Sequence, residues 1–270
     1  IRDLNRIEKV FNQHKPQVVF HAAAHKHVPL MEANVEEAVT NNVLGTKNVV
    51  ETAVKHEVER LVLISTDKAV RPASVMGATK RLAELSVLDA AQRNNLPYSV
   101  VRFGNVLGSR GSVVRTFKNQ IARGGPVTIT HPEMYRYFMI IPEAVHLVLQ
   151  AASMGTGGEV FMLNMGEQVR ILDLAEDLIR LSGLEPYRDI DIQVTGIRPG
   201  EKLREDLLED GVDFERTQHS EIFRMSKEEH VDGAALAQTL DKLADLALHS
   251  RTDDLIQTIN HFLPSGSVQQ

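Results

Sequence analysis

The sequence predicts an α/β fold: a doubly wound parallel sheet, Rossmann-like but lacking its first strands, with a smaller C-terminal lobe. Short apolar runs rich in β-branched residues alternate with longer segments of helical periodicity, which is the pattern of a parallel sheet covered by helices. A helix after each strand implies right-handed crossovers. The 270 residues, 43% of them hydrophobic, suffice for one large domain or two interleaved lobes with a substantial core.

The first part of the chain contains three strand-like runs and three helical patterns. The buried strands are predicted at 17–20, 60–65 and 98–103. The helices are predicted at 4–14, 35–56 and 74–94. In the last of them, apolar residues recur along one face at Leu82, Leu85, Leu88 and Ala91.

Beyond Gly104 the pattern loosens into loops rich in Gly, Ser and Pro. Helices are predicted there at 113–123, 142–154 and 172–182, and strands at 127–130, 159–164 and 190–195. A helical segment ends the chain, followed by a tail at 264–270 that we expect to be frayed.

A nucleotide-binding sheet of this type carries a glycine-rich turn after its first strand, at the N-terminus of the following helix. The sequence contains no such turn, and its first glycine is Gly45, inside a helical pattern. A helix at 4–14 before the strand at 17–20 indicates a start after the third strand of such a sheet, so we expect a truncated chain. The alternative is a chain that binds no dinucleotide.

Composition narrows the classes of function. A net charge of −6 argues against a nucleic-acid binder, so an anionic substrate needs a local cluster of Arg and Lys. There is no cysteine, no apolar run near the length of a membrane helix and no signal peptide, which favours a cytosolic protein without membrane contact. His25 and His27 have no third ligand at suitable spacing, so no metal site is predicted.

The residues after the second predicted strand carry hydroxyl, carboxyl and amine groups: Thr66, Asp67 and Lys68. Residues just past the carboxyl ends of such strands line the ligand crevice. On the next helix, Met76 and Lys80 are four residues apart and therefore share one face.

This string resembles the extended short-chain dehydrogenase/reductase pattern, in which Ser/Thr is followed by Tyr-x-x-x-Lys. Thr66 matches the hydroxyl residue and Lys80 the Lys, whereas Met76 holds the position of the Tyr. Asp67-Lys68 is similar to the acid–base pair of the UDP-N-acetylglucosamine 4,6-dehydratases. The membrane-anchored, polysaccharide-biosynthesis branch of that family carries Met in place of Tyr, and the match narrows to this branch.

The resemblance implies NAD-dependent 4,6-dehydration of a UDP-N-acetylhexosamine to a 4-keto-6-deoxy sugar. NAD⁺ takes hydride from C4, Lys68 removes the C5 proton, Asp67 protonates the departing C6 hydroxyl, and hydride returns to C6. Thr66 holds the C4 oxygen. Lys68 suits this role if cationic neighbours lower its pKa. A thioether cannot act as a base, so Asp67, Lys80, or Thr66 with water must replace the Tyr. Alternatively, Met76 is gap-filling core and the enzyme is inactive.

The resemblance also implies ligand contacts. On the NAD side these are Ala22, Ala23, Ala24, Asn42, Ser65, Lys80, Phe103 and Val106, with Asn42 supporting the active-site strand. On the substrate side they are Lys26, Asn105, Arg110, Ser112, Arg136, Arg198 and Glu201, the last two within Arg-Pro-Gly-Glu-Lys. Arg136 suits either uracil stacking or a phosphate. Residues 1–108 and 131–165 would form the partial NAD-binding domain, and 109–130 and 166–270 the sugar-nucleotide lobe.

Two other functions compete with the dehydratase. A 4-epimerase on the same fold needs no acid–base pair for C5 and C6, so Asp67-Lys68 argues against it. A non-catalytic UDP-sugar-binding module is favoured by Met76 and by the missing glycine turn. The resemblance further implies a cytoplasmic location, either as a free protein or as the cytoplasmic domain of an inner-membrane protein, and association into a homo-oligomer.

Overall fold

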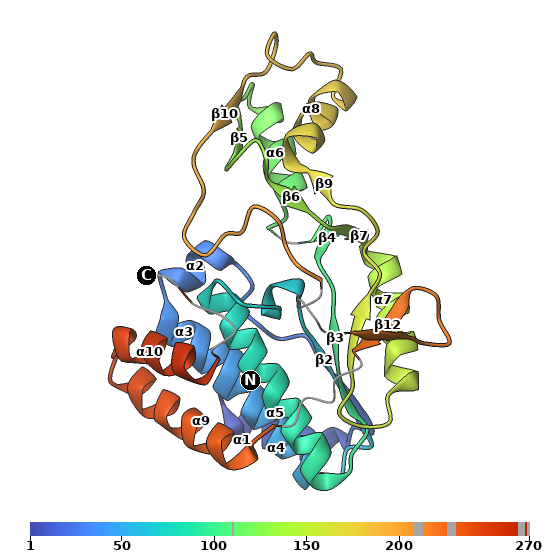
Figure 1. Cartoon of the computed structure of the whole chain (residues 1–270), viewed down its shortest axis with the longest axis vertical. Helices are drawn as coiled ribbons and strands as arrows, with labels where there is room; N and C mark the ends of the chain where they lie inside the picture. Colours follow the sequence, from blue (N-terminus) through green and yellow to red (C-terminus); the bar gives the residue numbers. More distant parts are fainter. Residues whose placement is uncertain (110, 208–212, 226–230, 264–267, 269–270) are drawn as a thin grey trace.

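The computed structural model describes residues 1–109, 111–207, 213–225, 231–263 and 268. Its centre is a six-stranded sheet in the order β1-β2-β3-β8-β12-β11 (Figure 1). The first four strands run parallel: β1 (Val18–His21), β2 (Arg60–Ile64), β3 (Tyr98–Arg102) and β8 (Val160–Leu163). The sheet ends in two antiparallel strands, β12 (Ile222–Met225) and β11 (Phe214–Arg216).

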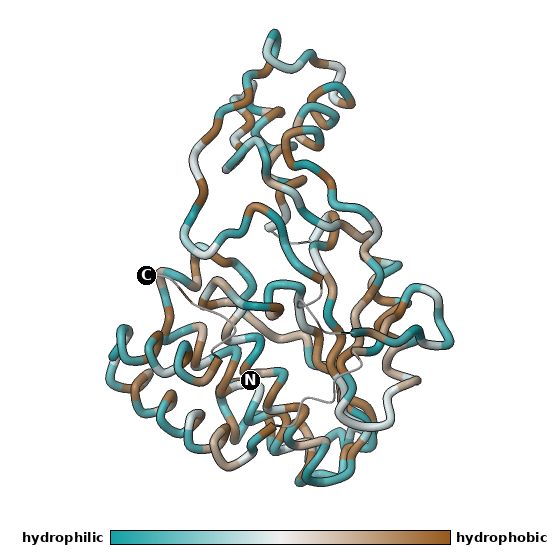
Figure 2. Tube along the Cα trace, viewed as in Figure 1, coloured by the Kyte–Doolittle hydropathy of each residue, from teal (hydrophilic) through white to brown (hydrophobic). Residues whose placement is uncertain are grey.

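Helices cover both faces of this sheet, because its strands are apolar on both sides. Leu61 and Leu63 of β2 face a core formed with α1 (Leu4–His14), α4 (Gly45–Lys55) and α5 (Val75–Asn94). Val62, between them, faces the opposite core, which is formed with α7 (Ile141–Met154). Figure 2 shows the hydrophobic segments concentrated along these strands. Both layers hold the carboxyl ends of β1, β2 and β3 in fixed positions.

The local sequence explains where α5 begins and ends. Ser74 accepts a hydrogen bond from Gly77 N (3.1 Å) and caps the N-terminus, and Asn95 ends the helix in the left-handed conformation (φ 51°). The helix is buried all round between the sheet and its helical neighbours. Side chains on its sheet-facing side are therefore held rigidly.

The helix predicted at 35–56 forms in three joined pieces. These are α3 (Val35–Ala38), a π-helical turn η1 (Val39–Leu44) and α4. The π turn contains Asn42, which is fully buried. π-Helical turns are rare and concentrate at functional sites.

A smaller lobe stands beyond the carboxyl ends of the parallel strands (Figure 1). It consists of α6 (Val113–Ala122), α8 (Ile171–Leu181) and the parallel pair β5 (Val127–Ile129) and β10 (Ile192–Val194). Phe117, Ala175 and Ile179 are among the residues of its own small core. Two short strand pairs lead to it: β4 (Asn105–Leu107) with β7 (Phe138–Ile140), and β6 (Tyr135–Arg136) with β9 (Val169–Arg170).

The C-terminal part of the chain lies with the large sheet. The predicted division placed all of 166–270 in the second lobe, but β11 and β12 extend the main sheet. Helices α9 (Gly233–Leu248) and α10 (Thr252–Phe262) bury apolar residues such as Leu243 and Ile259 in the core around α3, η1 and α5. The tail predicted to be frayed lies outside the described residues except for Val268. Among the described helices, none is long and apolar enough to cross a membrane.

Candidate active site

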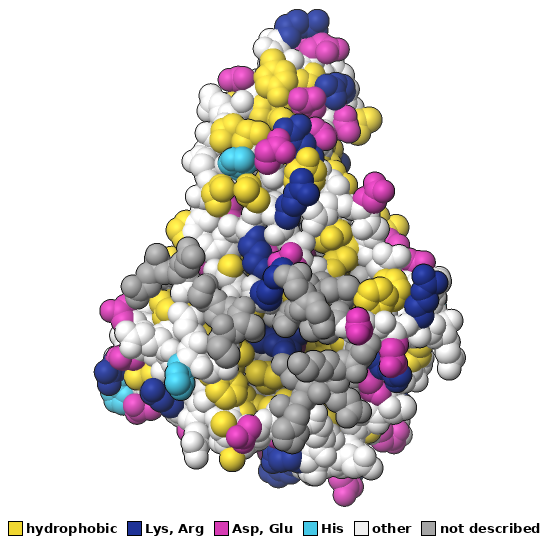
Figure 3. Space-filling model, in the orientation of Figure 1, with side chains coloured by type: hydrophobic (Ala, Val, Ile, Leu, Met, Phe, Trp, Pro, Cys, Tyr) yellow, Lys and Arg dark blue, Asp and Glu magenta, His cyan; other side chains and the backbone are white. Residues whose placement is uncertain are grey.

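A cleft of about 490 Å³ lies between the carboxyl ends of the parallel strands and the smaller lobe. Its walls come from the residues after β1, β2 and β3, from α5, from the start of α6 and from the segment 198–205. Lys and Arg side chains gather in Figure 3 along the waist where the two parts meet. This is the local cationic cluster that an anionic ligand requires in a chain of net negative charge.

Thr66, Asp67 and Lys68 follow β2 directly and form the short 3₁₀ helix η2 (Asp67–Ala69) with its cap. The Thr66 hydroxyl donates to Asp67 Oδ1 (2.9 Å), and Lys68 Nζ donates to the same oxygen (3.0 Å). Thr66 and Lys68 line the cleft, whereas Asp67 is fully buried behind them. Asp67 Oδ2 is buried without a hydrogen-bond partner. Such an oxygen is costly unless it carries or receives a proton.

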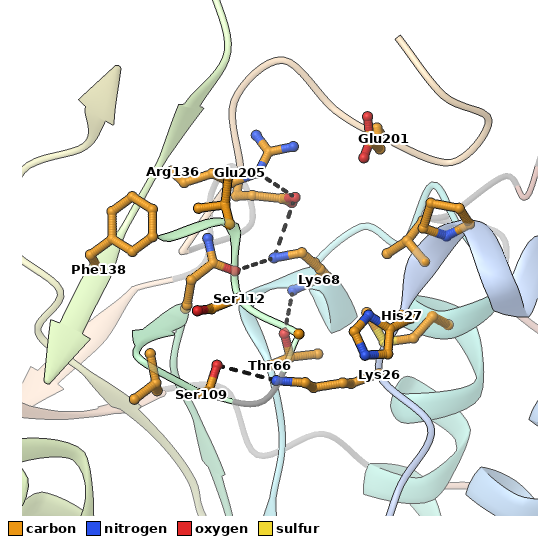
Figure 4. Close-up of a pocket in the computed structure, with 18 of the residues that line it drawn as sticks. Lys26, His27, Thr66, Lys68, Ser109, Ser112, Arg136, Phe138, Glu201 and Glu205 are labelled. Carbon is orange, nitrogen blue, oxygen red and sulfur yellow. Dashed lines mark hydrogen bonds and ion pairs between the residues drawn. The ribbon is translucent and has the colours of Figure 1, made fainter. Parts of the chain in front are cut away.

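Lys68 is surrounded by oxygen acceptors. Besides Asp67, its Nζ lies 3.4 Å from Asn105 Oδ1 and 3.5 Å from Glu205 Oε1 (Figure 4). Glu205 is only 5% exposed and lines the cleft. Sequence reasoning missed Glu205, although it stands only four residues after Glu201 of the Arg-Pro-Gly-Glu-Lys turn.

The expected lowering of the Lys68 pKa is wrong in this cleft. Burial acts to lower that pKa, but the carboxylates of Asp67 and Glu205 raise it, and Arg136 opposes them only in part. The net effect places the pKa of Lys68 above its usual value. The neighbours that decide this are acidic, not cationic.

Met76 and Lys80 lie on α5 and both line the cleft. Met76 is 3% exposed, and Lys80 Nζ donates to the carbonyl oxygen of Ile64 (2.9 Å). Burial lowers the pKa of Lys80 to about 8, with Glu84 opposing that change. The amine is therefore fixed at the end of β2 and gives up its proton more readily than an ordinary lysine.

Beneath these residues lies a buried charge cluster centred on Glu84. Its carboxylate accepts from Arg102 at both oxygens (2.8 and 2.6 Å), from Arg81 (2.8 Å) and from the Ser65 hydroxyl (2.6 Å). Burial would raise the pKa of Glu84, but these partners, Arg102 foremost, lower it to about 2. The cluster ties α5 to the ends of β2 and β3 and so holds the floor of the cleft.

Asn42 supports the segment that follows β1. Its Oδ1 accepts from His25 N (2.7 Å), and its Nδ2 donates to His25 O (2.9 Å) and to Thr79 Oγ1 (3.2 Å). The buried amide of Asn42 thus bonds both the backbone N–H and the backbone carbonyl of His25. Of the cofactor-side residues, Ala22, Ala24, Ser65, Lys80, Phe103 and Val106 line the cleft, whereas Ala23 and Asn42 do not.

Most of the substrate-side residues also line this cleft. Lining the cleft are Lys26, Asn105, Ser112, Arg136, Arg198 and Glu201; Arg110 lies outside the described residues. Lys26 Nζ donates to Ser109 Oγ (3.3 Å), as Figure 4 shows. Ser112 precedes α6, and its Oγ is buried without a partner. A free hydroxyl at a helix N-terminus suits an anion.

Arg136 is held by the backbone rather than by an aromatic ring. Its Nη1 donates to the carbonyl oxygens of Tyr135 (2.6 Å) and Leu203 (3.2 Å), and its Nε lies 3.8 Å from Glu205 Oε1. It is Arg204 that stacks on a ring, 4.4 Å from the centroid of Tyr135.

The Arg-Pro-Gly-Glu-Lys motif forms a turn over the cleft, closed by Glu201 N donating to Arg198 O (3.1 Å). Gly200 has a φ of 74°, and a Cβ on it would lie 2.7 Å from Glu32 Oε1 and 2.8 Å from Ser74 Cβ. Lys202 donates to the carbonyl oxygen of Val70 (3.2 Å), just after η2. These contacts fix the turn against the segment 66–70 that follows β2.

Comparisons with known proteins agree with this architecture. A family model described as "Polysaccharide biosynthesis protein" matches residues 1–227. The capsular polysaccharide biosynthesis protein CapD of Staphylococcus aureus is 57% identical over 225 residues, which are 83% of this chain and 37% of CapD. A UDP-glucose 4-epimerase of Rickettsia canadensis is 42% identical over 198 residues, 72% of this chain and 57% of the epimerase.

The structure of MoeE5 in complex with UDP-glucose and NAD matches with a TM-score of 0.65 and 26% identity, covering 74% of this chain and 72% of MoeE5. The predicted α/β, Rossmann-like parallel sheet is thereby confirmed. The chain spans 37% of CapD and 57% of the epimerase, so it corresponds to part of these longer proteins. The family model matches residues 1–227, and CapD is 57% identical over 225 residues. The chain therefore belongs to the polysaccharide biosynthesis protein family.

Proposed function

We propose that this chain carries the catalytic cleft of an NAD-dependent 4,6-dehydratase acting on a UDP-N-acetylhexosamine, with UDP-N-acetylglucosamine as the first candidate. The observation that carries the proposal is the Asp67–Lys68 pair at 3.0 Å, directly after β2 and beside Thr66. Removal of water across C5 and C6 needs a base for the C5 hydrogen and an acid for the C6 hydroxyl, and one carboxyl and one amine meet that need.

The cleft also fits one end of NAD. Ala22 and Ala24 leave room beside the end of β1, Phe103 and Val106 add an apolar wall, and Lys80 presents an amine for hydroxyl groups. NAD, when bound, would take up and return the hydride of the reaction. The chain's own residues would hold its nicotinamide end against the Thr66 side of the cleft.

Three neighbouring side chains share the proton transfers in this proposal. Lys68 lines the cleft and is suited to take the C5 proton once its own ammonium has lost one. Asp67 is reached from the cleft through Thr66, whose hydroxyl bonds its carboxylate, so the proton for the C6 hydroxyl would pass along that contact. Thr66 would also bind the C4 oxygen.

The opposite wall would bind the nucleotide. Arg198 and the N-terminus of α6, with the unpaired Ser112 hydroxyl, offer donors to a diphosphate. Glu201 can accept from ribose hydroxyls. Arg136, held by two carbonyl oxygens and facing Glu205, is suited to a phosphate or to the sugar rather than to stacking on uracil.

The test is an NMR time course of UDP-N-acetylglucosamine in D₂O with NAD⁺ and a full-length protein that contains this chain. We expect a 4-keto-6-deoxy sugar with solvent deuterium at C5. Unchanged substrate that nevertheless binds, seen by line broadening, would overturn dehydration and favour a non-catalytic UDP-sugar module.

A 4-epimerase is the second candidate, because a relative named UDP-glucose 4-epimerase is 42% identical to this chain. Epimerisation changes only C4 and leaves the C5–H bond intact. The same spectra separate the two, since an epimerase yields the C4 epimer with no deuterium at C5. The Asp67–Lys68 pair would have no task in that reaction.

A further inference from the structure

Glu205 is a buried acid in the cleft that takes no part in the proton transfers proposed for Asp67 and Lys68. Its side chain is 4% exposed, and it comes from the segment that also carries Arg198 and Glu201. The backbone around it is fixed: the Glu205 carbonyl oxygen accepts from Gln168 Nε2 (2.8 Å), and Lys202 anchors the segment at Val70 O. Its carboxylate is thereby held in a defined position.

Glu205 lies between two cations. Its Oε1 is 3.5 Å from Lys68 Nζ and 3.8 Å from Arg136 Nε, as the dashed lines of Figure 4 show. Arg136 also donates to two carbonyl oxygens, so it is held in place independently of Glu205. Lys68, in contrast, contacts only side-chain oxygens through its Nζ among the described residues.

The acceptors around Lys68 match its ammonium form. An ammonium has three N–H donors and no acceptor, and three oxygens surround this one: Asp67 Oδ1 (3.0 Å), Asn105 Oδ1 (3.4 Å) and Glu205 Oε1 (3.5 Å). A neutral amine in the same place would leave one acceptor facing its lone pair. In this arrangement Lys68 must therefore give up a proton before it can serve as a base.

Resting on the dehydratase function proposed above, we propose that Glu205 is a positioning residue that holds Lys68 as its ammonium beside Asp67 and sets the pH at which this amine becomes a base. The charged groups that act on Lys68 in the described part of the chain are Asp67 on its own short helix, Glu205 from the 198–205 segment and Arg136 from β6. Of these, Glu205 raises the pKa of Lys68 and Arg136 lowers it.

The contact between Glu205 and Lys68 also connects substrate binding to the base. Arg198, Glu201 and Glu205 belong to one anchored segment, so a sugar nucleotide that binds the first two also meets the third. A sugar hydroxyl that donates to the Glu205 carboxylate weakens the hold of that carboxylate on Lys68. Lys68 can then pass its proton to Asp67, which produces a neutral amine and a protonated carboxyl together, the two forms that dehydration needs.

The direct test measures the protonation of Lys68 without any turnover. Competitive acetylation across a pH series, read by mass spectrometry of the Lys68 peptide, gives the pH of half-maximal reactivity in the ligand-free full-length protein. Glu205→Gln keeps the size and one acceptor oxygen but removes the charge. We expect its half-reactivity pH to be about one to three pH units lower than that of the wild type.

Asp206→Asn is the matched control. Asp206 is the next residue in the same segment and loses the same charge, but it pairs with Lys202 (3.2 Å) and Arg71 (3.1 Å) instead of Lys68. We expect no change in Lys68 reactivity in this variant. Glu205→Asp, which keeps the charge, should move the value back toward the wild type. Thermal unfolding of each variant shows whether it is folded.

A second measurement follows the pH dependence of C5 deuterium incorporation. Glu205→Gln should shift its acid limb to lower pH, with UDP-sugar affinity within about twofold of the wild type. Unchanged Lys68 reactivity in Glu205→Gln, or an equal shift in Asp206→Asn, would overturn the inference. If Lys68 reactivity shifts but the wild type incorporates no deuterium, the role of Glu205 stands and the dehydratase function fails.

Discussion

Gly77 on α5 lies against the carbonyl oxygen of Lys68, so close that a Cβ on Gly77 would be 2.2 Å from that oxygen. The helix α5 and the short helix η2 are therefore in direct backbone contact. The absence of a side chain at one helical position lets η2 pack under the N-terminal turn of α5, where Ser74 caps the helix. Lys68 is thus positioned by its backbone as well as by its side-chain partners.

Gly77→Ala should displace η2 and lower both stability and activity. Because the opposing atom is backbone, the clash cannot be relieved by a rotamer change, and we expect a loss of about 1 to 3 kcal/mol in the free energy of unfolding. Denaturant unfolding and C5 deuterium incorporation measure the two effects. Gly45→Ala is the control, because the three atoms nearest to its added Cβ all belong to the Ile1 side chain and none to the backbone. Equal effects of the two substitutions would contradict the packing argument.

Asp67→Asn and Lys68→Ala should leave sugar-nucleotide binding near that of the wild type and stop water loss. Neither residue is among the donors proposed for the diphosphate, whereas each is proposed to carry one of the two proton transfers. Calorimetric binding of UDP-N-acetylglucosamine and the NMR time course check the two statements separately. Retained turnover in both variants would refute the acid–base assignment.

Met76→Leu should keep turnover within a few-fold of the wild type. Leu has nearly the volume of Met, and swaps of this kind cost less than about 1.5 kcal/mol in a buried site. The thioether cannot accept the proton of the sugar hydroxyl, so replacing Met76 by Leu removes no base. Met76→Ala, which leaves a cavity beside Lys80, should instead lower the unfolding temperature and the rate. Full loss of activity in Met76→Leu would point to a specific role of the sulfur.

Glu84 should make the protein sensitive to acid. Its pKa in the folded chain is about 2, below the usual value of 4.5, so its ionised form stabilises the fold at pH values above the ordinary pKa. That contribution should be lost as the pH falls from about 5 toward about 2. Urea unfolding at a series of pH values measures it.

Glu84→Gln should cost about 3 to 5 kcal/mol at neutral pH, because Arg102 then lacks its buried carboxylate. The variant should also lose less stability than the wild type between pH 5 and pH 2, in the direction given by the lowered pKa of Glu84. Glu167→Gln, a change at an exposed position, should reproduce the wild-type curve. Parallel curves for wild type and Glu84→Gln would show that the cluster does not govern acid unfolding.

Much of the fold could be predicted because its signals are local. The helix predicted at 4–14 is α1 with the same ends, since Asp3 caps it and Lys15 ends it in the left-handed conformation. Strands β11 and β12 were not predicted. Residues of β11 are exposed on both sides, and the pairing of β12 with β8 joins segments far apart in the chain. Only tertiary packing brings such strands into a sheet.

The candidate site, like the fold, could be predicted where its signals are local and not where they depend on tertiary packing. Thr66, Lys68, Met76 and Lys80 could be identified because strand end and helix spacing bring them together. The direction of the Lys68 pKa shift could not be predicted, since it depends on the carboxylates of Asp67 and Glu205 together, and Glu205 is brought to the cleft from far along the chain. One of several acids in a charged segment gives no signal of its own until the fold places it beside a cation.

The strand pairs that join the sheet to the smaller lobe have a mechanical consequence. The chain passes between the two parts at 105–113, 130–140, 164–171 and 195–207, and two of the β-pairs lie along these passages. A lobe attached by a single hinge swings freely, whereas one attached by several passages moves only when all of them bend together. These connections restrict the movement of the smaller lobe relative to the sheet. We therefore expect the lobe to shift only slightly when a ligand binds, without a large hinge rotation.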